Sequence, residues 1–303
     1  MRSSISSSDR RFIVALALWI VGLSAAANLV AGYGLGHWDW LSRRMQMPKF
    51  EVAANLQDYV RNWRRCPVVV LGSSVVGGLP PAGWEKPGVC SITLVGQGSL
   101  LGLDVMAQSP AAPKILFVES NFGFRDTVPD VVAATSDPVR RVIHDWLPLS
   151  TAQANWINAL GKSQFGEAHG LDRPTESWEA WRESRKAYAD IYVKMYGNPV
   201  GDWGRQHLEE NLQHTRTLVA ELERRGTKFI FFEAPLDPRL TELPVIALWA
   251  EKMHKAFADH DWVTDAPEKY YLTDGMHFMS GSGKDFFDLL MSHVPEAATI
   301  SAG

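Results

Sequence analysis

Two serines that follow an apolar run are the first candidates for chemistry in this chain. Val68–Leu71 is short, apolar and rich in β-branched residues, which predicts a strand buried on both faces of a parallel sheet. The run stops at Gly72, and Ser73 and Ser74 follow at once. A serine on the turn after such a strand lies at the carboxyl edge of the sheet, where α/β proteins bind their ligands. We therefore expect Ser74 to be a nucleophile, with Ser73 as the alternative.

A base for this serine is found near the other end of the chain. Asp274 and His277 are three residues apart on a glycine-containing stretch just before the last expected helix. This spacing can bring a carboxylate to one imidazole nitrogen. The carboxylate then fixes the tautomer and stabilises the imidazolium that forms when His277 takes the serine proton. With Ser74 these residues predict a Ser-His-Asp triad, although an Asp-x-x-His pair alone is also a common local turn contact.

Two charged residues near the third expected strand are further candidates. Glu119 follows the apolar end of that strand, and burial in a pocket would raise its pKa. The alternatives for Glu119 are a solvated strand-end carboxylate and an ion pair with Arg125. Arg125 is a candidate substrate contact, and its alternative is a surface ion pair with the adjacent Asp126.

The elements that must position these residues form a repeated pattern of strand, polar turn and helix. This pattern predicts an α/β fold with a central parallel sheet of about five strands. We expect strands at 68–71, 91–95, 114–118, 228–232 and 262–264, and helices at 52–63, 99–107, 203–226, 242–258 and 283–293.

Residues 126–200 interrupt the pattern, because they contain no convincing buried strand. We expect helices near 138–147, 151–162 and 176–196, forming an insertion over the active edge of the sheet, as a lid or an acceptor-binding cap. Trp181, Tyr188 and Tyr192 fall at helical spacing there, which predicts a stripe packed in the core. Exposed rings would instead let a polysaccharide stack on them.

The amino terminus predicts a membrane anchor. Residues 12–35 carry no charge and supply the roughly 20 apolar residues that a membrane-spanning helix needs. Basic residues in 1–11 predict a cytoplasmic amino terminus. The alternative is a cleaved signal peptide. We expect 36–65 to be a juxtamembrane connector and 66–303 to be one exported domain.

Composition limits the partners and cofactors. The formal net charge of −4 and the lack of an evident basic face predict no nucleic-acid partner. The histidines show no ligand-like pairing, so we expect neither a metal nor another cofactor. Cys66 and Cys90 each precede an expected strand, and an exported compartment permits a disulfide between them. The sequence leaves open whether their Cα atoms come close enough.

These segments, over about residues 66–125 and 226–293, resemble the SGNH (GDSL-type) hydrolase superfamily. Its Gly-Asp-Ser block aligns with Gly72–Ser74, which makes Ser74 the nucleophile and puts Ser73 where Asp is usual. Its Gly-x-Asn-Asp block aligns with Glu119–Phe122, without the Gly and the final Asp. Its Asp-x-x-His block aligns with Asp274 and His277. The resemblance implies a three-layer, flavodoxin-like fold.

The resemblance also implies an oxyanion hole. The second block of the family supplies a glycine amide, for which Gly98 fits, with Gly96 as the other register. The third block supplies an asparagine side-chain amide, which would come from Asn121. Together with the amide of Ser74, these donors would stabilise the developing oxyanion.

An exported SGNH-like domain behind a single membrane helix is similar to bacterial proteins that acylate cell-surface polymers. These include the D-alanyl-transfer protein of teichoic acid modification and the O-acetyltransferases of alginate. The similarity implies an O-acyltransferase at the inner membrane. Its acceptor would be an envelope glycan, its domain would be periplasmic or extracellular, and its partner a membrane-bound O-acyltransferase. The alternatives are a membrane-anchored esterase with the same triad and a non-catalytic scaffold.

Overall fold

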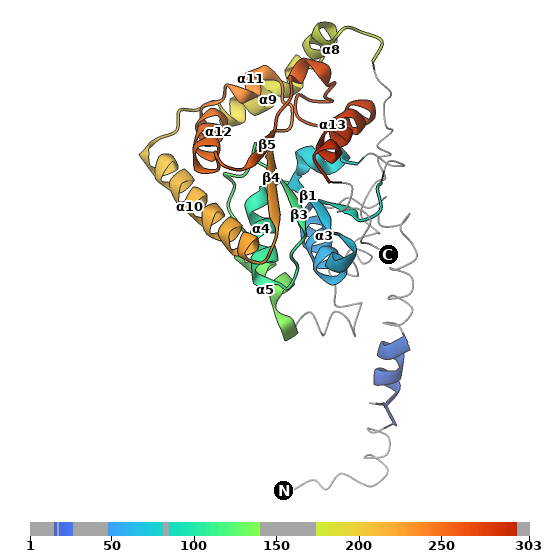
Figure 1. The fold of residues 1–303 in the computed structure, drawn as a ribbon. Helices are drawn as coiled ribbons and strands as arrows, with labels where there is room; N and C mark the ends of the chain where they lie inside the picture. Colours follow the sequence, from blue (N-terminus) through green and yellow to red (C-terminus); the bar gives the residue numbers. More distant parts are fainter. Residues whose placement is uncertain (1–14, 17, 27–47, 81–84, 140–173, 296–303) are drawn as a thin grey trace, which may run out of the picture. The chain divides into compact units, whose positions relative to one another are not determined.

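The computed structural model describes residues 15–16, 18–26, 48–80, 85–139 and 174–295 (Figure 1). The chain divides into two compact units. One comprises Met1–Phe50 and Pro138–Glu167, and the other comprises Glu51–Asp137 and Ala168–Gly303. The sheet and every candidate site residue belong to the second unit.

A five-stranded parallel sheet forms the centre of this unit. Its strand order, β2-β1-β3-β4-β5, is the 2-1-3-4-5 order of doubly wound, flavodoxin-type sheets. The predicted α/β fold with five parallel strands is therefore confirmed. The strands are β1 (Val68–Ser73), β2 (Val89–Leu94), β3 (Ile115–Glu119), β4 (Lys228–Phe232) and β5 (Asp261–Val263).

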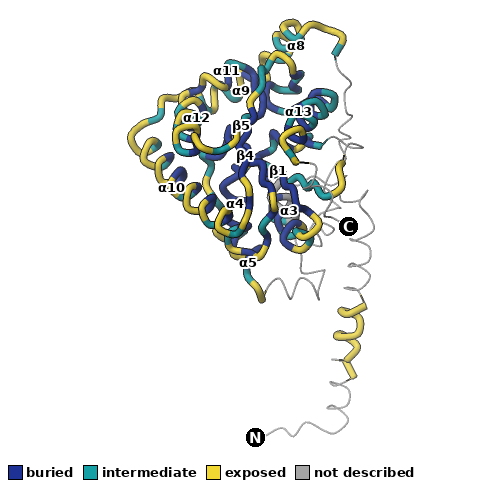
Figure 2. Tube along the Cα trace, viewed as in Figure 1, coloured by how far each residue is buried: buried dark blue, intermediate teal, exposed yellow. Residues whose placement is uncertain are grey.

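Both faces of the sheet are covered, as the alternation of side chains along β1 shows. Val69 and Leu71 belong to one hydrophobic core and Val68 and Val70 to another. Since successive strand residues point to opposite faces, a continuous apolar run is what a sheet buried on both sides requires (Figure 2). The first core includes residues of α3 (Pro48–Asn62), α4 (Ser99–Gln108) and α10 (Asp202–Arg224), and the second includes residues of α13 (Ser280–Ser292).

The strand order places a topological switch point between β1 and β3. From β1 the chain crosses to β2 on one side, and from β2 it returns to β3 on the other. The register pairs Leu71 with Val118, so the carboxyl ends of the two strands are nearly level. Ser73 and Glu119 therefore end neighbouring strands where open α/β sheets bind ligands.

The described part of the 126–200 insertion is helical. It contains α5 (Pro129–Ser136), α8 (Trp178–Ser184) and α9 (Lys186–Tyr196), and no strand among its described residues. The stretch expected as one helix over 176–196 is two helices, which meet at Arg185, whose backbone leaves helical geometry at φ −102°, ψ 2°. Residues 140–173 lie outside the described residues, and so do nearly all of the helices expected at 138–147 and 151–162.

The predicted membrane anchor is only partly described. Residues 15–16 and 18–26 are helical, and the remainder of 12–35 lies outside the described residues. Within the described ranges no helix has both the length and the apolar character needed to cross a bilayer. The anchor therefore stays a prediction.

Cys66 and Cys90 form a disulfide, with their Cα atoms 5.4 Å apart. The pairing of β1 with β2 brings the cysteines together, because Cys90 pairs with Val69, three residues after Cys66. The bridge ties the segment just before β1 to the edge strand β2.

Replacing both cysteines by serine should lower the free energy of unfolding by about 3 kcal/mol. The bridge closes a loop with a sequence separation of 24 residues, and closing such a loop restricts the unfolded chain. Urea denaturation of the Cys66→Ser/Cys90→Ser variant and of the oxidised parent measures the difference, and the reduced parent is the matched control. Equal unfolding midpoints for the variant and the oxidised parent would show that the bridge adds no stability.

Candidate active site

Asp274 and His277 lie on a tight turn before α13. The turn is enclosed by an antiparallel bridge between Leu272 and Phe278 and by the hydrogen bond from the Thr273 amide to the His277 carbonyl, at 2.8 Å. Asp274 Oδ2 accepts from His277 Nδ1 at 2.7 Å, while Oδ1 accepts from the His277 amide at 2.9 Å. An ionised carboxylate only accepts, so Nδ1 carries the hydrogen and Nε2 is left to take a proton.

Asp274 is held in its ionised form. Burial of this carboxyl raises its pKa. The hydrogen bond and charge of His277, together with the hydrogen bonds from the amides of His277 and Met276, lower it by more, and the pKa falls to about 2. The carboxylate is therefore charged at neutral pH. Its geometry suits the orientation of the imidazole and the stabilisation of an imidazolium, and not proton donation.

Gly275 lets the turn pack closely against the helices beside it. Its φ of +88° lies in the left-handed region, which favours glycine. A Cβ at this position would also lie 3.2 Å from the Ala189 Cβ and 3.3 Å from the Asp237 Cβ. The Asp237 amide donates to the Gly275 carbonyl at 2.8 Å. The turn is thus fixed from outside by α9 and by the segment before α11 (Pro238–Thr241).

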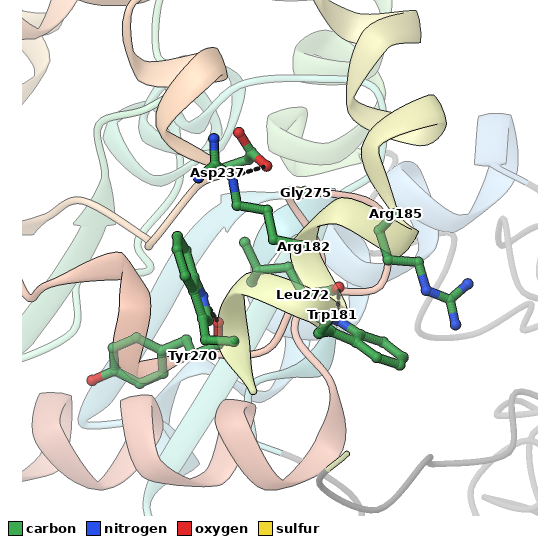
Figure 3. A pocket seen from close by; sticks show the side chains of 8 residues that line it. Trp181, Arg182, Arg185, Asp237, Tyr270, Leu272 and Gly275 are labelled. Atoms are coloured by element: carbon green, nitrogen blue, oxygen red, sulfur yellow. Dashed lines mark hydrogen bonds and ion pairs between the residues drawn. The ribbon is translucent and has the colours of Figure 1, made fainter. Parts of the chain in front are cut away.

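Helix α8 supports the segment that leads into this turn (Figure 3). Trp178 Nε1 donates to the Tyr270 carbonyl at 3.1 Å, and Trp181 Nε1 donates to the Leu272 carbonyl at 2.8 Å. These elements line a shallow hollow, where Arg182 donates to Asp237 at 3.2 Å. The two indoles therefore bind protein backbone through their N–H groups.

Tyr192 on α9 adds a contact that sequence reasoning missed. Its hydroxyl donates to Asp274 Oδ2 at 3.2 Å, the same oxygen that His277 uses. Burial raises the pKa of Tyr192 to about 12, with the charge and hydrogen bond of Asp274 acting in the same direction, so the hydroxyl remains a donor. Helical spacing had predicted only a core position. The contact joins residues 82 apart in the chain, and periodicity carries no such information.

Tyr192→Phe should lower kcat/KM by about tenfold, because it removes one hydrogen bond to the ionised Asp274 and keeps the ring. Hydrolysis of p-nitrophenyl acetate by the purified full chain provides the measurement. The matched control is Tyr188→Phe, which changes an exposed tyrosine one turn earlier on the same helix and should leave the rate unchanged. Equal rates for Tyr192→Phe and the parent would remove Tyr192 from the site.

Ser74 begins the 3-10 helix η2 (Ser74–Gly78), directly after β1. Its side chain is half-buried, and its hydroxyl has no hydrogen-bond partner among the described residues. The helix lies next to the histidine turn, because a Cβ at Gly78 would be 3.8 Å from the Phe278 carbonyl oxygen. No hydrogen bond joins Ser74 and His277 in the described part of the chain. Such catalytic contacts often tighten only when substrate binds.

Ser73 is buried, at 1 % exposure, and its amide and hydroxyl are both hydrogen-bonded. Its amide donates to Glu119 Oε2 at 2.5 Å, and its hydroxyl donates to Glu119 Oε1 at 3.1 Å. The same hydroxyl accepts from the Val75 amide at 3.3 Å. The geometry therefore favours Ser74 over Ser73 as the nucleophile, and gives Ser73 the role of fixing the turn.

In the part of the chain that the structure describes, Glu119 is neither a solvated strand-end carboxylate nor an ion-pair partner of Arg125, the two alternatives that the sequence offered. It is 1 % exposed, so it is not a solvated carboxylate, and it forms no ion pair with Arg125 within the described structure. Burial raises its pKa, although the hydrogen bonds from Ser73 and the charges of Arg125 and His277 act against the rise. Relative to the Gly-Asp-Ser pattern, an acid is missing at residue 73, and a carboxylate reaches the same turn from β3 instead.

Glu119→Gln should flatten the dependence of stability on pH. A carboxyl whose pKa is higher in the folded protein favours folding below its unfolded value, here 4.5, and this contribution is lost as the pH rises through the folded pKa. The unfolding free energy of the parent should thus fall, relative to that of the variant, as the pH rises from 4.5. Urea denaturation across this range measures it, with Glu242→Gln, an exposed change, as the control. Parallel curves for parent and Glu119→Gln would contradict the raised pKa.

Gly98 stands between β2 and α4, at the carboxyl edge of the sheet. It is buried at the amino end of α4, and a Cβ there would collide with the Phe122 carbonyl oxygen. Gly96, the other register, is exposed and precedes the helix by three residues. An amide at a helix amino terminus is oriented toward negative charge. The close approach to Phe122 explains why residue 98 must lack a side chain.

Asn121 has a structural role that the sequence did not indicate, and its predicted oxyanion contact stays a prediction. Its Oδ1 accepts from the Ala234 amide at 2.7 Å, and its Nδ2 donates to the Ala234 carbonyl at 3.1 Å. These bonds join the end of β3 to the segment after β4. A carboxamide has two N–H groups, so one remains available to an oxyanion.

Arg125 lies beside Gly98, since its Cβ is 3.3 Å from the position that a Gly98 Cβ would take. Its expected alternative, an ion pair with Asp126, is wrong. Asp126 instead pairs with His207 Nε2 at 2.5 Å.

The described residues contain no group of three or more His, Cys, Asp or Glu side chains that could hold a metal ion. His207 contacts the carboxylates of Asp126, at 2.5 Å, and Glu210, at 3.9 Å, and His214 contacts that of Asp104. Ser74, Gly98 and Asn121 thus follow the carboxyl ends of β1, β2 and β3, and the turn with Asp274 and His277 lies next to the Ser74 helix. No protein-family model, no curated protein and no solved structure matches the chain.

Proposed function

We propose that this protein is a serine-dependent O-acyltransferase of the SGNH type that acts on a cell-envelope or secreted polysaccharide. The observation that carries the proposal is the 2.7 Å contact between His277 Nδ1 and Asp274 Oδ2, on a turn next to the Ser74 helix. The position of Ser74 at the carboxyl end of β1 and next to the switch point supports it further.

In the first half of the reaction, Ser74 Oγ attacks the acyl carbonyl and His277 Nε2 takes the hydroxyl proton. Asp274 stabilises the imidazolium. The amides of Ser74 and Gly98 and the free N–H of Asn121 are the donors for the oxyanion. When the tetrahedral intermediate collapses, His277 returns the proton to the leaving group, and the acyl group stays on Ser74 as an ester.

In the second half, a hydroxyl of the glycan attacks this ester while His277 Nε2 takes its proton. Collapse transfers the acyl group to the glycan oxygen and returns the proton to Ser74. In the proposed setting, residues 12–35 anchor the protein in the bacterial inner membrane, and a membrane-bound O-acyltransferase supplies the acyl group. Esterase activity would use the same residues, with water in place of the glycan hydroxyl.

The experiment gives the purified full chain, in detergent, an activated acyl donor with and without a polysaccharide acceptor. Acyl groups appearing on the glycan, and absent with Ser74→Ala, support transfer. Release of free acid alone, equally with and without glycan, supports the esterase. Equal activity in the parent and in Ser74→Ala contradicts catalysis by Ser74. A folded parent with no activity on any donor favours the scaffold alternative.

A further inference from the structure

Arg125 is held rigidly at the edge of the site by neutral groups. Its guanidinium carbon lies 4.6 Å from the centre of the Phe122 ring. One terminal nitrogen donates to the Tyr196 hydroxyl at 2.9 Å, and the other donates to the Gln97 carbonyl at 3.4 Å. A stacked and hydrogen-bonded guanidinium is pre-organised, so little conformational entropy is lost when it binds a further group.

The charge of Arg125 has no carboxylate partner within ion-pair distance in the described part of the chain. Three other half-buried arginines of this protein do have carboxylate partners or several carbonyl partners. Arg182 and Arg239 both pair with Asp237, and Arg225 donates to three carbonyls near the end of α4. A guanidinium has five N–H donors, and the contacts of Arg125 use two of them.

Arg125, with its unused N–H donors, lies near the candidate active site. It lies beside Gly98, and Tyr196, which holds it, is one turn along α9 from Tyr192, which holds Asp274. Its charge also acts on the pKa of Glu119 and on that of Tyr192. A group bound by Arg125 would therefore lie at the same edge of the sheet as Ser74 and Gly98.

We propose that Arg125, supported by Phe122 and Tyr196, binds an anionic group of the substrate, a carboxylate or a phosphate, beside the acyl-transfer centre. This inference rests on the proposed function, because it identifies the acyl acceptor or the acyl donor of that reaction as an acidic molecule. The binding itself does not depend on catalysis. A planar guanidinium pairs with two oxygens of either group, which gives direction as well as charge.

Isothermal titration calorimetry on the full chain in detergent, in a Ser74→Ala background, measures binding without turnover. The probes are trigalacturonate, a tri(glycerol phosphate) and the neutral methyl ester of trigalacturonate. We expect at least one anionic probe to bind at least about tenfold more tightly than the ester at low salt, with the preference reduced by added salt. The better probe distinguishes a carboxylate from a phosphate ligand.

Arg125→Gln should remove the preference for the anionic probe, and Arg125→Lys should restore part of it. The matched control is Arg185→Gln, which changes another half-buried arginine that stacks on an aromatic ring, Trp181, at 4.4 Å. Equal binding of charged and neutral probes by the parent would overturn the inference. So would an equal loss in Arg185→Gln and Arg125→Gln. Neither result bears on the triad, which is tested separately by the activity of Ser74 variants.

Discussion

Replacing Ser74 by alanine should lower the rate of acyl transfer by at least about 10⁴-fold, because no acyl-enzyme can form. The residual rate would come from substrate binding and the oxyanion donors alone. Steady-state kinetics with an activated ester measure the loss, and a thermal unfolding curve establishes that the variant is folded.

The control for Ser74 is its neighbour. Ser73 is buried and hydrogen-bonded to Glu119, so Ser73→Ala should cost stability and shift the turn, while a measurable acylation rate remains. A larger loss of rate in folded Ser73→Ala than in Ser74→Ala would exchange the roles of the two serines.

Asp274→Asn should lower kcat by about 10⁴-fold with little change in KM. The carboxylate, whose pKa is about 2, is a pure acceptor and fixes the hydrogen of His277 on Nδ1. An asparagine can present its N–H₂ group to Nδ1, which would move the ring hydrogen to Nε2 and remove the base.

Asp259→Asn is the matched change for this prediction, because Asp259 is an exposed aspartate on the same domain. It should leave kcat and KM as they are in the parent. If Asp274→Asn retained more than a tenth of the parent rate in a folded protein, the carboxylate would have only a structural role in its turn.

Much of the fold could be predicted from local patterns. The apolar run of β1 and the polar turn after it follow from burial on both faces of a parallel sheet, and the alternation of Val69 and Val70 between two cores bears this out. The break between α8 and α9 at Arg185 could not be predicted. Trp181 and Tyr188 continue a helical spacing across it, and the interruption is in the backbone alone.

The candidate site divides in the same way. Ser74, Asp274 and His277 could be chosen because each stands next to a strand or helix end in the sequence. The partners that hold them could not. Tyr192 reaches Asp274 over 82 residues, and Glu119 reaches Ser73, the neighbour of Ser74, over 46. Such contacts depend on how the strands and helices assemble. Residue types and spacing indicate which residues are candidates for chemistry, whereas the three-dimensional fold decides which residues position them.

The central claim is that Ser74 is a nucleophile activated by His277. Its most direct test is labelling of the full chain with a fluorophosphonate, followed by peptide mapping. We predict one adduct, on Ser74, that is lost in Ser74→Ala and His277→Ala and kept in Ser73→Ala. An adduct on a different serine, or no adduct on the folded parent protein, would contradict the claim.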